Sequence, residues 1–194
     1  MNSLRLGILG SGQGGNCRQI LERIRAGTLA AEVRLIASDV FDARILEVAR
    51  EFAVPNAFLQ PGKFRTKLEP GSEAALARML QDAEVEIVAL AGFMRVLKKP
   101  MLNAFPRRII NIHPSLLPKF PGREAWRQAL EAGEHVTGCT VHYVDAGIDS
   151  GDIIAQRTVP VLANDTAKTL HARIQIAERD LYPEVLQSLA ISRV

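Results

Sequence analysis

The segment LRLGILGSGQGGNCRQILERIRA, residues 4–26, carries the pattern from which the fold follows. Its first six residues are mostly apolar, as in a buried strand, and a glycine-rich turn follows at Gly10–Gly15. Residues 16–26 then place Ile20 and Ile24 about one helical turn apart. A strand, a glycine turn and a helix in this order are typical of the first unit of an α/β fold.

The alternation of strand and helix continues beyond this first unit. We expect strands at 33–37, 54–58, 86–91 and 108–112, helices at 43–52, 73–82 and 100–105, and a surface loop at 60–70. The strand at 86–91 (EIVALA) is almost entirely apolar, as in the interior of a parallel sheet. We therefore predict a doubly wound, Rossmann-like α/β fold with a mostly parallel sheet flanked by helices.

The C-terminal part of the chain follows a different pattern. Residues 138–144 and 153–161 alternate more between polar and apolar positions, and the turn-like segment 145–151 joins them. This alternation is typical of antiparallel strands, so we predict an antiparallel pair at one side of the sheet. A long helix over 165–189 follows, in which Pro183 favours a kink.

Length and composition narrow the class of protein. The chain has 194 residues without internal repeats or a linker, so we expect a single domain over residues 1–194. The formal net charge of +3 is spread along the chain, which argues against a nucleic-acid partner. With no long apolar run, no signal-peptide pattern and two distant cysteines, the sequence favours a cytoplasmic protein with small-molecule ligands and no membrane span. A monomer and a homodimer are both compatible with it.

The glycine turn predicts an anion site. Gly10, Gly12 and Gly15 have the spacing G-x-G-x-x-G, and the N-terminus of the following helix offers backbone N–H groups and partial positive charge. Asp39 ends the next strand, where a dinucleotide enzyme places its ribose-binding acid. Asn16 and Arg18, immediately after the glycines, suit a single phosphate at least as well. A tight turn that needs glycine for its conformation is the third interpretation.

The octapeptide Asn111–Pro118 (NIHPSLLP) follows a predicted buried strand. Side chains alternate along an extended chain, so Asn111 and His113 share one face, and Pro114 keeps His113 extended. This pair offers a neutral hydrogen-bond donor and a titratable imidazole at the carboxyl end of a strand, where open α/β sheets bind ligands. It suits a reaction that develops negative charge on an oxygen and moves a proton.

A carboxylate partner for His113 is expected from the later turn. Asp149 there would hold the imidazole, raise its pKa and stabilise the imidazolium. Asp145 and Asp152 are competing candidates, and Asx turns are the alternative use of these aspartates. A zinc site built from His113, His142 and an aspartate is conceivable, but the spacing matches no metal motif, so we predict no metal.

One further loop is a candidate for ligand binding. Gly92–Leu97 (GFMRVL) follows the predicted strand at 86–91, again at a carboxyl end. An apolar loop with one arginine suits a flat heterocycle with an acidic tail, and ordinary loop packing is the alternative.

Together these segments resemble the glycinamide ribonucleotide formyltransferases of purine synthesis. The resemblance covers nearly the whole chain, in order and with matching spacing, and the wider group of formyl-folate enzymes shares its central motif. The segments that carry it are Gly14–Asn16, Leu90–Leu97, Asn111–Pro118, Gly138–His142, Asp149–Gly151, Gln175–Glu178 and Tyr182–Pro183.

The resemblance implies a formyl donor, 10-formyltetrahydrofolate, and an amine acceptor that bears a ribose phosphate. For the phosphate and ribose it implies Gly14, Gly15, Asn16 and Glu178. For the folate it implies Lys67, Met94, Arg95, Val96, Leu97, Asn111, Val144 and Asp145. For catalysis it implies Asn111, His113 and Asp149.

The implied reaction agrees with the chemistry of these residues. The amine attacks the formyl carbon, and Asn111 and a protonated His113 stabilise the oxyanion that forms. A proton then passes from the attacking nitrogen to the departing folate nitrogen, through His113 or through a water bound to Asp149.

The sequence departs from the family pattern in three places, and two other functions stay open. The departures are Arg123–Trp126 in place of a histidine-bearing stretch, Gly15 in place of a usual serine, and Asp152 in place of a frequent proline. They bear on the acceptor and leave the formyl-transfer residues intact. The open alternatives are a formyltransferase for another amine, such as a sugar nucleotide, and a nicotinamide-dependent oxidoreductase that uses the glycine turn.

Overall fold

The fold is described by a computed structural model over residues 3–192. The strands are β1 (Leu4–Leu9), β2 (Ala31–Ser38), β3 (Asn56–Phe58), β4 (Ile87–Leu90), β5 (Ile109–His113), β6 (Val136–Tyr143) and β7 (Ile153–Pro160). The helices are α1 (Gly15–Arg25), α2 (Arg44–Glu51), α3 (Pro70–Asp82), α4 (Lys99–Ala104), α5 (Ala125–Glu131) and α6 (Ala167–Ile191). None of these helices is long and apolar enough to cross a membrane.

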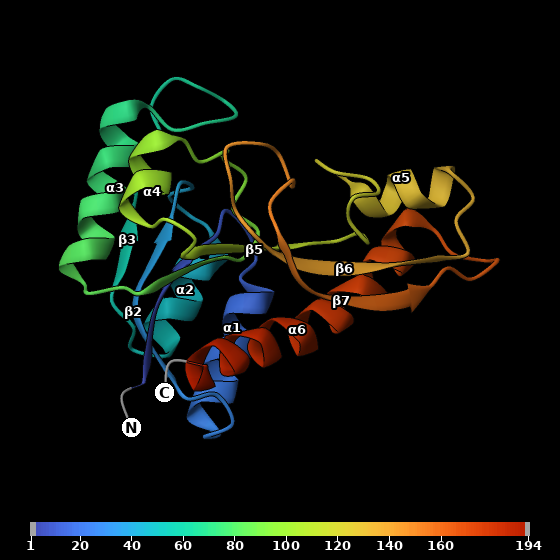
Figure 1. Cartoon of the computed structure of the whole chain (residues 1–194), viewed down its shortest axis with the longest axis horizontal. Coiled ribbons are helices and arrows are strands. Elements are labelled where there is room, and N and C mark those ends of the chain that lie inside the picture. The colour runs from blue at the N-terminus through green and yellow to red at the C-terminus, as the bar shows by residue number, and fades with distance from the viewer. Residues whose placement is uncertain (1–2, 193–194) are drawn as a thin grey trace.

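The strands form one seven-stranded sheet in the order β3-β2-β1-β4-β5-β6-β7 (Figure 1). Neighbours from β3 to β5 pair in parallel, and β5–β6 and β6–β7 pair antiparallel. The predicted fold class is therefore confirmed, including the antiparallel pair. The chain moves outward from β1 to β3 and then returns to β4 on the other side of β1, which creates a topological switch point between β1 and β4.

The structure corrects the predicted elements in two places. Helix α3 begins at Pro70 and not at residue 73, because proline is well suited to the first turn of a helix, so the preceding loop is shorter than expected. Helix α5 was not predicted from the sequence. It is only seven residues long, and its N-cap residue, Glu124, has a left-handed φ of 54° and makes no side-chain capping bond.

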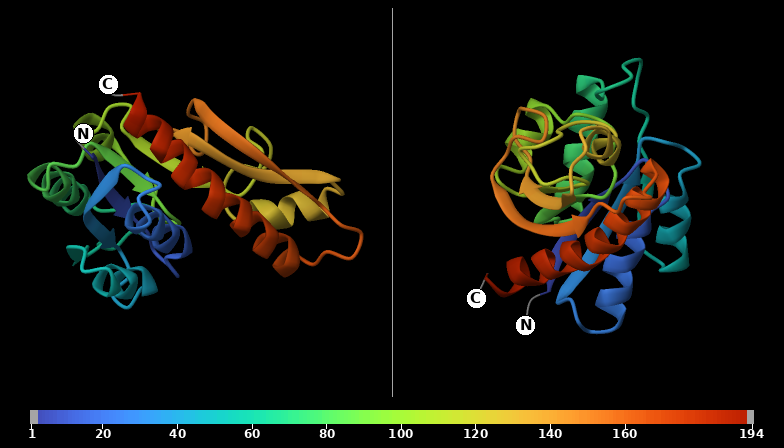
Figure 2. Two further views of the ribbon diagram at one scale, coloured as in Figure 1. Left: turned by 90° about the horizontal axis from the view of Figure 1, so that it is seen from below. Right: turned by 90° about the vertical axis from the view of Figure 1, so that its right-hand side faces the viewer.

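Helices cover both faces of the sheet and form two hydrophobic cores. One core joins the sheet to α1, α2 and α6, and the other joins it to α3 and α4. Figure 2 shows α6 running as one long helix from the β6–β7 pair toward the N-terminal half of the sheet. Pro183 lies inside this helix, which continues to Ile191.

A buried tyrosine fixes α6 against the centre of the sheet. Tyr182 is fully buried, and its hydroxyl lies 3.1 Å from the carbonyl oxygens of Leu90 and Ile110, to which it donates. A buried phenol normally finds such a partner, since an unpaired hydroxyl would be costly. This bond also fixes the position of Glu178, one turn earlier on α6, relative to β4 and β5.

Candidate active site

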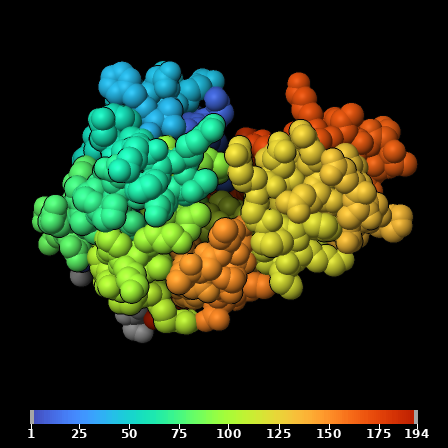
Figure 3. Space-filling model, turned by 90° about the horizontal axis from the view of Figure 1, so that it is seen from above, coloured from blue at the N-terminus to red at the C-terminus, as the bar shows by residue number. Residues whose placement is uncertain are grey.

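The carboxyl ends of β1, β4 and β5 meet at one edge of the sheet. The loops after β1 and β4 are joined directly, because the Ser11 amide donates to the Gly92 carbonyl (3.0 Å) and the Met94 amide donates to Ser11 Oγ (2.9 Å). Figure 3 shows this side of the molecule hollowed between the teal and green segments and the yellow segment, with the orange β6–β7 turn at one end. The candidate residues come from the ends of β5 and β6, from α6 and from the loops that follow β1, β4 and β6.

His113 and Asp149 form a buried pair at the end of β5. His113 Nδ1 lies 3.2 Å from Asp149 Oδ2, and His113 Nε2 lies 2.9 Å from the Phe120 carbonyl oxygen. The Gly122 amide donates to the same Asp149 oxygen (2.8 Å). His113 is only 4% exposed. Both ring nitrogens therefore face oxygens that only accept, so both contacts become hydrogen bonds when the ring is protonated.

Burial and these contacts act on the pKa of His113 in opposite directions. Burial lowers its pKa, while the Asp149 carboxylate and the Phe120 carbonyl raise it, and the net pKa lies below the ordinary value. Asp149 raises this pKa as expected, but burial outweighs the carboxylate, so the protonated His113 that was expected is not favoured in the free protein. For Asp149, burial acts to raise the pKa, but its bond with His142, the charge of His113 and the Gly122 amide together lower it. At neutral pH the free protein thus holds a neutral imidazole beside an ionised carboxylate.

His142 is a site residue that sequence reasoning treated only as a metal alternative. Antiparallel pairing places it directly opposite Asn111. Its Nε2 lies 3.2 Å from Asn111 Nδ2 and 3.6 Å from Asp149 Oδ1, and its Nδ1 lies 2.9 Å from the Tyr143 carbonyl oxygen. Because that carbonyl only accepts, Nδ1 carries a hydrogen. Nε2 faces both the Asn111 amide and the Asp149 carboxylate.

Asn111 is oriented by these neighbours and keeps donor capacity. Its Nδ2 also lies 3.5 Å from Asp149 Oδ1, which is long for a hydrogen bond. Since only the contact with His142 has ordinary hydrogen-bond length, at least one of the two amide hydrogens is only weakly engaged. The amide is placed to donate to an oxygen that takes up negative charge beside His113.

The glycine turn and α6 form the other side of the hollow. Gly14 is the N-cap of α1, with a φ of 74°, and α1 has no side-chain cap and no acidic residue in its first turn. Asn16 Nδ2 donates to Glu178 Oε2 (3.0 Å), while Asn16 Oδ1 is buried without a hydrogen-bond partner among the described residues. The predicted acceptor residues Gly14, Gly15, Asn16 and Glu178 thus lie together. Free amide donors and an unpaired oxygen suit a polar, anionic ligand.

Glu178 has a pKa that burial raises from 4.5 to about 7, against the Asn16 amide and the charge of Arg179. In the unfolded chain the carboxyl ionises near 4.5, whereas the folded protein keeps the proton until about 7. The folded state therefore binds the extra proton in this window, and this group makes the free energy of unfolding fall as pH rises from 4.5 to 7.

We expect Glu178→Gln to remove this component, because glutamine does not ionise. Urea unfolding at several pH values should show the stability of the variant rising relative to the unmodified protein from pH 4.5 to 7. Glu131→Gln, at an exposed position of α5, should follow the unmodified protein. Parallel curves for Glu178→Gln and the unmodified protein would contradict the shifted pKa.

The predicted folate residues of the β4 loop are placed by their own contacts. The Arg95 side chain already has partners within the protein: Nε pairs with Asp39 Oδ2 (2.6 Å), and Nη1 donates to the Phe64 carbonyl. Val96 forms an isolated parallel bridge with Lys67. Leu97 is buried in the core, and Met94 is 62% exposed. A ligand at this loop would therefore meet mainly backbone atoms and the Met94 side chain.

The structure distinguishes Asp145 and Asp152 from Asp149, the other candidate partner of His113. Asp145 Oδ1 accepts from the Gly147 amide (2.9 Å) and from Ser150 Oγ (2.9 Å), so it forms an Asx turn as expected. Asp152 is exposed and pairs with Arg107 (2.8 Å). Val144, beside Asp145, donates its amide to the Ile109 carbonyl (2.9 Å), which ties this turn to the start of β5.

Asp39 does not fit the role of a ribose-binding acid. It is 5% exposed, with one oxygen accepting from Ser11 Oγ (2.5 Å) and the other from Arg95 Nε (2.6 Å). The Asp39 carboxylate therefore links the loop after β1, through Ser11, to the loop after β4, through Arg95. This use counts against the dinucleotide interpretation of the glycine turn.

Comparison with known proteins agrees with this arrangement. Residues 4–186 match the family model described as formyl transferase. The chain belongs to the formyl transferase family. A phosphoribosylglycinamide formyltransferase from Bacillus subtilis is 40% identical over 185 residues, which cover 95% of this chain and 94% of that protein.

Other members of the formyl transferase family match over the same extent. The crystal structure of glycinamide ribonucleotide transformylase 1 from Symbiobacterium toebii is 47% identical, with a TM-score of 0.94 over 99% of this chain and 90% of that one. The trifunctional purine biosynthetic protein adenosine-3 of Drosophila pseudoobscura pseudoobscura is 43% identical over 96% of this chain. The chain spans only 14% of the length of that protein.

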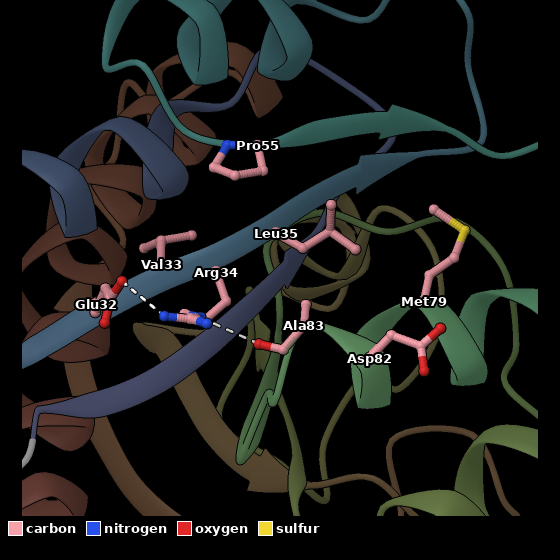
Figure 4. Close-up of a pocket in the computed structure, with 8 residues that line it drawn as sticks. All are labelled: Glu32, Val33, Arg34, Leu35, Pro55, Met79, Asp82 and Ala83. Carbon is pink, nitrogen blue, oxygen red and sulfur yellow. Dashed lines mark hydrogen bonds and ion pairs between the residues drawn. The ribbon is translucent and has the colours of Figure 1, made fainter.

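A second hollow of this formyl transferase is less suited to bind the substrates of a formyl transfer. A hollow of about 520 Å³ lies near the amino end of β2, and Figure 4 shows its arginine, Arg34, already bonded to Glu32 and to the Ala83 carbonyl. It lies away from the carboxyl ends of the strands, where such folds bind ligands.

His113, His142 and Asp149 do converge as the zinc alternative required, but no group of His, Cys, Asp and Glu within residues 3–192 is arranged to hold a metal ion.

The departure at Arg123–Trp126 has a structural consequence in this formyl transferase. The Trp126 ring stacks on His171 of α6, with centroids 3.6 Å apart and planes within 5°. This contact holds α5 against α6. The segment between β5 and α5, which supplies the Phe120 carbonyl and the Gly122 amide, is thus anchored at both ends.

Proposed function

We propose that the protein transfers the formyl group of 10-formyltetrahydrofolate to the amine of N1-(5-phospho-D-ribosyl)glycinamide, a step of de novo purine (IMP) biosynthesis. The observation that carries this proposal is the convergence of Asn111, His113 and Asp149 beside the glycine turn in a formyl transferase. The name of the Bacillus subtilis relative, which this chain matches over nearly its whole length, supports the choice of acceptor. We expect the reaction in the cytoplasm, on small molecules, by a monomer or a homodimer.

The catalytic residues have separate roles in this proposal. Attack of the amine on the formyl carbon moves an electron pair onto the formyl oxygen, and the Asn111 amide donates to that oxygen. The neutral His113 takes up a proton from the attacking nitrogen, and the imidazolium donates to Asp149 and to the Phe120 carbonyl. As the bond from carbon to the folate nitrogen breaks, that nitrogen receives a proton from His113 or from a water bound to Asp149.

The two substrates occupy opposite sides of the catalytic group. The phosphate of the acceptor would lie at the N-terminus of α1, against Gly14, Gly15 and Asn16, and the ribose hydroxyls would face Glu178. The folate would lie against residues 94–97, with Lys67 near its acidic tail and the turn at Val144 and Asp145 over its ring. The bridge between Lys67 and Val96 supports this wall of the site.

A spectroscopic assay of tetrahydrofolate formation tests the function. The purified protein should turn over when both substrates are present and should show no product when either one is omitted. Absence of turnover with glycinamide ribonucleotide, together with turnover on an amino sugar nucleotide, would replace the acceptor and keep the reaction. Micromolar binding of NAD(H) without formyl transfer would favour the oxidoreductase alternative.

A further inference from the structure

Arg179 of α6 lies over the first residue of α1. A β-carbon on Gly15 would lie 3.1 Å from Arg179 Nη2, 3.4 Å from Nε and 3.6 Å from Cζ. The first of these distances is tighter than ordinary packing, so the guanidinium rests against the backbone of Gly15 because this residue has no side chain. Glycine and arginine at these two positions form a matched contact at the mouth of the anion site.

Within residues 3–192, the Arg179 guanidinium acts on the neighbouring Glu178 carboxyl through its charge. It makes no hydrogen bond or ion pair there, although the residue is half-buried. Other arginines nearby are paired, as Arg173 is with Asp165 (2.6 Å) and Arg157 with Glu184 (2.7 Å). A partly desolvated arginine gains most from a carboxylate or phosphate that accepts two of its N–H groups. No carboxylate within residues 3–192 forms an ion pair with Arg179, so its N–H groups are left for an added anion.

The surroundings of Arg179 point to the same kind of ligand. The first backbone bond of α1 runs from the Arg18 amide to the Gly14 carbonyl (2.8 Å), which leaves the amides of residues 15–17 outside the helical ladder. Asn16 Oδ1, buried without a partner among residues 3–192, requires a donor, such as a sugar hydroxyl. Amide donors, a cation and an unpaired oxygen side by side match a phosphate attached to a sugar.

We propose that Arg179 binds the phosphate of the acceptor directly and is a specificity-determining residue for phosphorylated amines. This inference rests on the proposed function, because it names a group of the proposed acceptor. The guanidinium and the N-terminus of α1 hold the phosphate from two sides. The phosphate neutralises Arg179, and the contact anchors the acceptor end that is remote from the reacting amine.

Steady-state kinetics of Arg179→Ala and Arg179→Lys test the proposal. We expect the KM for glycinamide ribonucleotide to rise about tenfold to a hundredfold in Arg179→Ala, as for loss of a charge-assisted hydrogen bond. The kcat and the KM for the folate should change by less than about threefold, which separates binding of the phosphate from general damage. Arg179→Lys should recover only part of the affinity, because an ammonium cannot form the bidentate contact.

The matched control is Lys168→Ala, which removes an equal charge from an exposed position of the same helix. A comparison with the dephosphorylated acceptor isolates the phosphate, since Arg179→Ala and the unmodified protein should use it equally poorly. An unchanged KM in Arg179→Ala, or an equal rise in Lys168→Ala, would overturn the assignment. So would a deficit that persists on the dephosphorylated acceptor.

Calorimetry with ribose 5-phosphate tests the residue independently of catalysis. The unmodified protein should bind this probe, and Arg179→Ala should bind it at least about tenfold more weakly. If the unmodified protein binds it but does not use glycinamide ribonucleotide, the proposed function fails while Arg179 keeps its ligand. If the unmodified protein does not bind it, or if Arg179→Ala binds it equally well, the inference fails.

Discussion

His113→Ala is expected to slow formyl transfer by about a hundredfold or more, the usual contribution of a positioned acid or base. The imidazole is 4% exposed and lies within 3.2 Å of the Asp149 carboxylate, so no water takes its place without rearrangement. Removal of the imidazole also leaves the Asp149 carboxylate without the imidazolium charge that forms beside it during proton transfer. Single-turnover rates with both substrates saturating measure the chemical step directly.

A second variant separates chemistry from folding. His113→Gln keeps a polar side chain at the buried position and should be equally slow, with an unfolding transition near that of the unmodified protein. His135→Ala, at an exposed position before β6, should retain the full rate. A rate within a few-fold of the unmodified protein in both His113 variants would remove this residue from the mechanism.

Asp149→Asn is expected to reduce kcat by about a hundredfold to ten-thousandfold. Asparagine tolerates the left-handed φ of 51° at this position, and its Oδ1 can still accept from the Gly122 amide. The change therefore removes the negative charge and little else. Because the carboxylate is the largest interaction that opposes the effect of burial on His113, its loss lowers the pKa of His113 further.

The pH–rate profile gives this prediction a second measurement. The limb that reports on His113 should move to lower pH in Asp149→Asn, in addition to the loss of rate. Asp152→Asn is the matched control, since Asp152 is exposed and pairs only with Arg107, and it should leave both rate and profile unchanged. A normal rate in Asp149→Asn would mean that the charge of Asp149 has no part in catalysis.

The order of strands and helices followed from the sequence because hydrophobic periodicity reports burial. The segment Ile87–Leu90 is apolar on both faces and is buried on both faces in the sheet. Helix α5 escaped prediction because it is short and starts without a capping side chain. Its position depends on the stacking of Trp126 on His171, a tertiary contact that local pattern does not contain.

The site was predictable only in part, because a local sequence pattern does not contain the tertiary contacts that complete the site. Strand alternation placed Asn111 and His113 on one face without further knowledge. The choice of Asp149 among three aspartates came from the resemblance, and the role of His142 required the pairing of β5 with β6 that sets it opposite Asn111. The contacts from the Phe120 carbonyl and the Gly122 amide involve backbone atoms, which carry no residue-specific signal in a sequence.

The Tyr182 hydroxyl joins α6, which carries Glu178, to the end of β4 at Leu90 and to Ile110 near the start of β5. The position of α6, and with it Glu178, relative to these two strands is therefore set inside the hydrophobic core, whereas the loops proposed to hold the phosphate and the folate lie outside it. Engineering of new acceptors can accordingly change residues of the glycine turn while Tyr182 keeps α6 in place against β4 and β5. A redesigned enzyme would then change its substrate without moving Glu178 relative to these two strands.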